Sequence, residues 1–219
     1  SNEISQCDIS DHETTNYSIS VVGDFNCIRY SRLFAIGGVR MGGDDCEFRN
    51  NLVFSNAYGI RLEGDRGRIR ENRIGFETNG GAAIAFSGPG IEAIGEDNVV
   101  GDEFPDGGDG NQIVASGGPG IRAAGGFTGI RGNWVGCASN DGLYVYGGCG
   151  TGIEVSGGVS NALYRNFVVD SAGDGIVLSN CPAAQVMDCR IGVCPQDLMR
   201  ANGGRGLVLH GSPRNDLWG

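Results

Sequence analysis

The chain has 219 residues, of which 41 are glycine and only 8% aromatic, so it does not have the composition of an ordinary globular core. Its net charge of −10 argues against nucleic acid as a partner, because phosphate contacts need a basic field. All 16 basic residues are arginine, which excludes chemistry based on a lysine, and no apolar run is long enough for membrane insertion.

A pair of short strands recurs along the chain. Residues 59–62 (GIRL) and 69–75 (IRENRIG) are matched 61 residues later by 120–123 and 130–136 without a gap. Apolar and polar residues alternate in each copy, which is typical of strands with one buried face, and glycine-rich turns follow. In chain order, the first strand of each copy is predicted to begin near Ile19, Val39, Ile60, Ile84, Ile121, Ile153, Ile176 and Leu207.

This repeat predicts a solenoid. The pattern G-I-x-L-x-G followed by I-x-x-N-x-I-G resembles the parallel β-helix repeat of the pectin-lyase-like superfamily, and the resemblance implies a right-handed helix of three parallel sheets and, often, carbohydrate substrates. We therefore predict an all-β, right-handed parallel β-helix of about eight coils, forming one domain over residues 1–219. Without a helix to close either end, it is expected to be an excerpt of a longer solenoid or multidomain protein. Insertions are predicted at 102–111, 137–150 and 194–204.

The second strand of most copies is followed by an asparagine. Because coils stack at about 4.8 Å, equivalent residues should form a ladder in which each amide bonds to the turn of the next coil. The predicted structural ladder contains Asn51, Asn72, Asn133 and Asn166, with Asn98 as a further member.

Arginine forms a second kind of ladder. Outward positions of the second strands contain Arg29, Arg49, Arg70 and Arg131, followed by Tyr164, and those of the first strands contain Arg40, Arg61 and Arg122. A line of planar cations at coil spacing suits carboxylates or sulfates along a polymer, so these arginines are predicted to bind an anionic polysaccharide. The alternative is that they pair with Glu47, Glu63, Glu71 and Glu154 and keep the surface soluble.

An acidic ladder is also predicted. Asp24, Asp44 and Asp65 each follow a glycine after a first strand, so their carboxylates should stack at one turn. Calcium could neutralise them, although aspartates solvated at a turn and paired with arginines are the simpler interpretation. No cofactor is required. The run 106–111 (DGGDGN) is a weaker calcium-binding candidate.

Catalytic candidates are few. Gly43-Asp44-Asp45-Cys46 resembles a fragment of the aspartate pair of polygalacturonases, but that family's G-H-G and R-x-K motifs and the epimerase motif D-P-H-E are missing. His210 is predicted to point outward near the last coil, where it could act as a base. Asp44, Asp45 and His210 are the catalytic candidates.

Eight cysteines without zinc-site spacing predict disulfides and an extracellular or cell-surface protein. Cys137 and Cys149 would close an insertion, and Cys27 and Cys46 would join adjacent coils. Cys181, Cys189 and Cys194 compete for partners, so the connectivity stays open.

The sequence thus favours a binding module for an extended, anionic polysaccharide. One alternative is a polysaccharide lyase, hydrolase or epimerase, which requires the outward carboxylates to converge with Arg40, Arg61 or His210. The other is a structural stalk or filament subunit, in which open coil ends associate end to end or as homo-oligomers.

Overall fold

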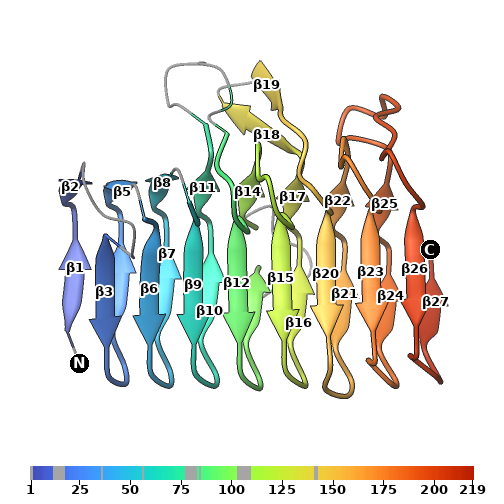
Figure 1. Ribbon diagram of the computed structural model, residues 1–219, viewed down its shortest axis with the longest axis horizontal. Coiled ribbons are helices and arrows are strands. Elements are labelled where there is room, and N and C mark those ends of the chain that lie inside the picture. Colours follow the sequence, from blue (N-terminus) through green and yellow to red (C-terminus); the bar gives the residue numbers. More distant parts are fainter. Residues whose placement is uncertain are drawn as a thin grey trace.

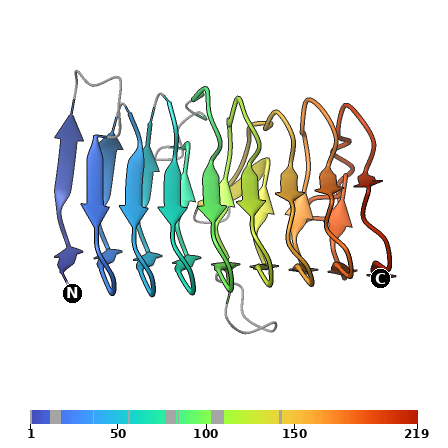
Figure 2. The ribbon, with the colours of Figure 1, turned by 60° about the horizontal axis from the view of Figure 1, so that its bottom comes forward.

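The computed structural model describes residues 2–11, 18–35, 37–55, 57–76, 83, 85–102, 110–140 and 143–219. In these residues the chain forms strands and turns without a helix. The strands stack into three parallel sheets, and successive coils follow one another from the N-terminal to the C-terminal end (Figures 1 and 2). The predicted right-handed parallel β-helix of about eight coils is confirmed.

Each coil passes through the three sheets in the same order. Sheet C contains the first strands: β3 (Ile19–Val22), β6 (Val39–Gly42), β9 (Ile60–Glu63), β12 (Ile91–Ile94), β15 (Ile121–Ala124), β20 (Ile153–Ser156), β23 (Ile176–Ser179) and β26 (Leu207–His210). Sheet A contains β1 (Glu3–Ser5), β4 (Cys27–Arg29), β7 (Glu47–Arg49), β10 (Arg68–Arg70), β13 (Val99–Gly101), β16 (Gly129–Arg131), β21 (Ala162–Tyr164), β24 (Gln185–Met187) and β27 (Asp216–Trp218).

Sheet B completes the coil. Its parallel strands are β2 (Asp8–Asp11), β5 (Arg32–Ala35), β8 (Leu52–Phe54), β11 (Arg73–Ile74), β14 (Gln112–Ile113), β17 (Trp134–Val135), β22 (Phe167–Val168) and β25 (Arg190–Ile191). An antiparallel hairpin of β18 (Cys137–Asn140) and β19 (Leu143–Tyr146) follows β17, pairs with β14 through β18 and projects beyond the coils (Figure 1). The predicted insertion 137–150 is therefore largely this hairpin.

The core consists of stacked aliphatic side chains. In sheet C, Val39, Ile60, Ile91 and Ile121 lie opposite one another on successive coils, and each is at most 1% exposed. Alternation along each strand turns the next residue outward. The burial of each coil therefore depends on its two neighbours, as expected of a solenoid.

One predicted strand was in the wrong place. The first strand of the fourth copy begins at Ile91, in register with Ile60 and Ile121, whereas Ile84 lies outside the described residues. Gly90 explains why the strand begins at Ile91, because a Cβ on Gly90 would lie 2.5 Å from the Ile113 side chain. A Gly-Ile pair therefore marks the start of a first strand where neighbouring coils approach closely.

The asparagine ladder exists, with one member changed. It lies at the turn between sheets A and B and contains Asn51, Asn72, Asn111, Asn133 and Asn166, each at most 2% exposed. The side-chain oxygen of Asn51 accepts from the Ser31 N–H at 3.0 Å, and that of each later member accepts from the backbone N–H of the preceding asparagine, at 2.9 to 3.1 Å.

Asn98 was wrongly assigned to this ladder. It lies at the turn between sheets C and A, where its Oδ1 accepts from the Gly67 N–H at 2.8 Å. Asn111 occupies the predicted place because residues 102–110 separate β13 from the turn in this coil. Cys189 follows Asn166 at the end of the ladder, in the place of an asparagine, with its sulfur 3.7 Å from the Asn166 amide nitrogen.

The predicted disulfides are absent, because all eight cysteines lie in the described ranges and are free. Cys27 is half-exposed and lies opposite Glu47, whereas Cys46, one residue earlier in register, is buried and faces inward. The two thiols are therefore on opposite faces of the sheet. Cys149 belongs to the main core and Cys137 to a separate small cluster.

Thiol titration without reductant is expected to count eight thiols after unfolding. In the native protein Cys7, Cys27 and Cys189, which are half-exposed, should react first with an aromatic disulfide reagent. Burial raises the pKa of the Cys137 and Cys149 thiols to about 12, so these should stay unreactive until the chain unfolds. A count below eight in the denatured protein would show disulfides and restore the original interpretation.

Candidate functional site

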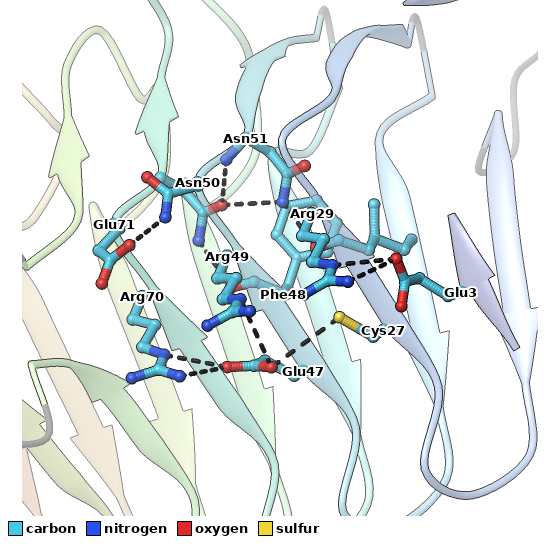
Figure 3. Close-up of polar contacts among 12 residues, drawn as sticks. Glu3, Cys27, Arg29, Glu47, Phe48, Arg49, Asn50, Asn51, Arg70 and Glu71 are labelled. Atoms are coloured by element: carbon cyan, nitrogen blue, oxygen red, sulfur yellow. Dashed lines mark hydrogen bonds and ion pairs between the residues drawn. The ribbon is translucent and has the colours of Figure 1, made fainter. Parts of the chain in front are cut away.

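The predicted arginines of the second strands form a row on the outer face of sheet A. Arg29 lies opposite Arg49, and Arg49 opposite Arg70, on three successive coils (Figure 3). On β13 the residue opposite Arg131 is Gly101, so the row continues after one gap. Arg29, Arg49, Arg70 and Arg131 are called the sheet A row below. Tyr164 follows Arg131, as predicted.

Three arginines of this row share two carboxylates. Arg29 binds Glu3 through Nε and Nη2 at 3.0 and 2.8 Å, and Arg70 binds Glu47 in the same way at 3.0 and 2.6 Å. Arg49 lies 3.7 Å from Glu47, which is too far for a hydrogen bond. The guanidinium of Arg29 lowers the pKa of the Glu3 carboxyl, so this pair stays ionised at neutral pH. The row therefore has a local excess of positive charge.

Arg49 is a member of the row with an unused donor. Its Nε is buried with no hydrogen-bond partner among the described residues. Its guanidinium lies 5.7 Å from the centre of the Tyr30 ring, and that of Arg29 lies 5.8 Å from the same ring. Tyr30 therefore holds the two arginines side by side on adjacent coils. Arg131 makes no ion pair within the described ranges.

A shallow groove of about 380 Å³ adjoins the row at the turn between sheets A and B. Its lining residues are Tyr30, Ser31, Arg32, Asn50, Asn51, Leu52, Glu71 and Arg73. Glu71, expected to pair with an arginine, instead accepts a hydrogen bond from the Asn50 amide (Figure 3). Arg32 and Arg73 were not predicted as site residues. They occupy the first position of sheet B strands, three residues after Arg29 and Arg70, and this spacing could have revealed them.

The arginines of the first strands are neutralised. Their register on sheet C runs in the order Arg40, Arg61, Glu92, Arg122 and Glu154, so Glu92 interrupts the predicted line. Arg61 lies 2.5 Å from Glu63 and 2.9 Å from Glu92. Arg122 lies 3.2 Å from Glu154. For this sheet the predicted alternative, arginines paired with glutamates, describes the surface.

Glu63 is held by two arginines. Its Oε2 accepts two hydrogen bonds from Arg40, at 2.9 and 2.5 Å, while Arg61 binds its other oxygen. The hydrogen bonds of Arg40 lower the pKa of the Glu63 carboxyl, and Arg61 adds to this effect against the opposing effect of burial. Glu92 was missed because the fourth first strand was placed at Ile84.

The acidic ladder forms at the turn after sheet C, as predicted. Oδ1 of Asp24 accepts from the Asp44 N–H at 2.9 Å, and Oδ1 of Asp44 accepts from the Asp65 N–H at 3.0 Å. Arg66 pairs with Asp44 and Asp45 at 3.2 and 2.9 Å. In the described part of the chain, no three His, Cys, Asp or Glu side chains are grouped as a metal site. The candidate run 106–111 lies mostly outside the described residues.

The catalytic candidates do not converge. Asp44 and Asp45 lie in the turn after β6, and the guanidinium of Arg66 lowers the pKa of the Asp45 carboxyl. His210 lies on β26, at the opposite end of sheet C. The groups that do meet, Arg40 and Arg61 with Glu63, are joined in ion pairs.

Fold and surface together define a parallel β-helix protein with an arginine row on one outer sheet. No family model matches the chain, and no curated protein matches it. Membership of the pectin-lyase-like superfamily therefore remains a proposal. Within the described ranges there is no helix long and apolar enough to cross a membrane.

Proposed function

We propose that this protein is an extracellular or cell-surface β-helix module of the pectin-lyase-like type that binds an extended, anionic polysaccharide along the sheet A row. The observation that supports this proposal best is Arg49, an arginine with an unused donor in a row where three arginines share two carboxylates. In a chain of net charge −10, such a local excess of cations is unusual. Planar guanidinium groups bind carboxylates and sulfates in a bidentate manner.

The geometry also suggests the shape of the ligand. Arginines on adjacent coils are separated by about 4.8 Å, the spacing of paired strands, so the row runs along the solenoid axis. A linear polymer lying along this axis can present one anionic group after another to the row. The groove lined by Arg32 and Arg73 runs beside it and widens the contact surface.

The test is binding of polygalacturonate, alginate and chondroitin sulfate by calorimetry, at low and high salt. Arg49→Gln is expected to weaken binding about tenfold or more, because a charge-assisted contact is lost. Binding should weaken as salt increases. Arg205→Gln is the matched control, since Arg205 is exposed, pairs with Asp174 at 3.1 Å and lies outside the sheet A row.

Other outcomes have defined meanings. If wild-type protein binds and Arg49→Gln binds equally well, the sheet A row is not the site. Formation of new reducing ends or unsaturated products would favour the hydrolase or lyase alternative, and a changed uronate composition without cleavage would favour the epimerase. No binding to any of the three polymers would reject the proposal and favour the structural stalk or filament subunit.

A further inference from the structure

Aromatic side chains gather on the outer face of sheet B beside the hairpin. Trp134 on β17 and Phe167 on β22 lie opposite each other on adjacent coils, with ring centres 5.9 Å apart. Tyr144 on β19 stacks parallel to Trp134 at 6.1 Å, and Tyr146 stacks beside Tyr144 at 6.4 Å. All four rings are half-buried, so each keeps part of its surface in contact with solvent.

The hairpin is fixed in place, which orients these rings. One of its faces is buried, where Ala138 and Val145 pack against Phe76 and Val114. The N–H of Ser139 donates a hydrogen bond to the side chain of Gln112 on β14, at 2.9 Å. The opposite face carries both tyrosines, so Tyr144 is held against Trp134 before any ligand binds.

The rim of this cluster is polar but neutral. Arg200 lies 3.9 Å from the centre of the Tyr146 ring, and Arg190 lies 5.3 Å from that of Phe167. Each arginine also pairs with an aspartate, so neither adds net charge. The Tyr146 hydroxyl donates to the side chain of Gln196 at 3.1 Å. The surface thus combines aromatic rings, with Trp134 and Phe167 meeting edge to face, and planar polar groups beside them.

We propose that Trp134, Tyr144 and Phe167, here called the aromatic platform, form a subsite that stacks against a pyranose ring of the bound polysaccharide. A pyranose has a face lined with weakly positive C–H groups, which suits the electron-rich face of an aromatic ring, and hydroxyls at its edge for the polar rim. The neutral rim fits an uncharged ring, in contrast with the sheet A row.

This inference rests on the proposed function, because the platform would act on the same ligand. Trp134 follows Arg131 across the two-residue turn between sheets A and B. A polymer lying along this corner of the solenoid can therefore contact a cation of the row and a ring of the platform together. The sheet A row would select an anionic polymer, and the aromatic platform would fix the position of one of its sugars.

Tryptophan fluorescence provides the test, because the chain has only two tryptophans and the other, Trp218, is on β27. In a Trp218→Phe background, Trp134 is the sole reporter. Hexasaccharides of galacturonate, mannuronate, β-1,4-glucose, β-1,4-mannose and β-1,4-xylose are titrated one at a time. We expect at least one of them to bind and to shift the Trp134 emission to the blue. Tyr144→Ala and Phe167→Ala should each weaken that binding about tenfold. Tyr58→Ala, at an exposed tyrosine outside the platform, is the control.

The two proposals fail in different ways. If Arg49→Gln weakens binding while Trp134 emission stays constant for every sugar, the platform is rejected and the proposed function stands. If Trp134 responds to a neutral hexasaccharide and Arg49→Gln has no effect on any anionic polymer, the proposed function is rejected and the platform stands. Unchanged affinity in both Tyr144→Ala and Phe167→Ala, in variants with wild-type circular dichroism, also rejects the platform.

Discussion

Gly158→Ala is expected to destabilise the solenoid by roughly 4 kcal/mol or more. A Cβ at this position would lie 2.1 Å from the carbonyl oxygen of Gly125 and 2.4 Å from the nitrogen of Gly126. These are backbone atoms of the adjacent coil, held by the β-sheet ladders on both sides, so they cannot rotate away as a side chain would. The substitution therefore has to push two coils apart and stretch their hydrogen bonds.

Gly157→Ala separates this clash from backbone strain. Gly157 and Gly158 have nearly the same left-handed backbone, with φ of +71° and +70°, but a Cβ on Gly157 would have nothing within 4 Å. Gly157→Ala should therefore cost only the strain of a left-handed alanine, about 1 kcal/mol. Urea unfolding followed by circular dichroism measures both. Equal losses in the two variants would mean that contact between coils does not set the glycine requirement.

Local pattern was enough to predict the repeat and most of the first strands. Alternation and the Gly-Ile pair are properties of a few adjacent residues, so Ile60, Ile121 and Ile153 could be assigned directly. The first strand of the fourth copy was predicted wrongly because an apolar stretch at Ile84 precedes the true strand, which begins at Ile91. Gly90-Ile91 is the same Gly-Ile pair as in the other copies, so this strand could also have been placed from the sequence.

The sequence predicted the position of the candidate site but not which of its arginines are neutralised by carboxylates. Strand register placed the sheet A row correctly, because each strand pairs with its counterpart one coil away. How far carboxylates neutralise an arginine depends on side-chain geometry, and here Arg61 pairs with two glutamates whereas Arg49 shares Glu47 with Arg70. The aromatic platform was missed because Tyr144 belongs to a segment treated as an insertion.

Asn72→Ala is expected to cost about 3 to 5 kcal/mol, because it removes four hydrogen bonds from a fully buried turn. Oδ1 of Asn72 accepts from the N–H and Nδ2 of Asn51, at 2.9 and 3.1 Å. Its Nδ2 donates to the Phe48 carbonyl and to Oδ1 of Asn111, both at 2.9 Å. Alanine would leave the Asn51 N–H buried without its acceptor and would remove the amide donor from the Phe48 carbonyl.

Two further variants show whether the ladder is the cause. Asn72→Ser should be intermediate, because Ser31 already occupies a ladder position and donates to the Arg29 carbonyl at 2.9 Å. Asn50→Gly removes an exposed amide next to the ladder at a residue with φ of +54°, which glycine adopts easily, so it should cost less than about 1 kcal/mol. If Asn72→Ala were no worse than Asn50→Gly in urea unfolding, the stacked amides would not stabilise the coils. The order Ala, Ser, Asn in increasing stability would show that each coil depends on a hydrogen bond received from the next.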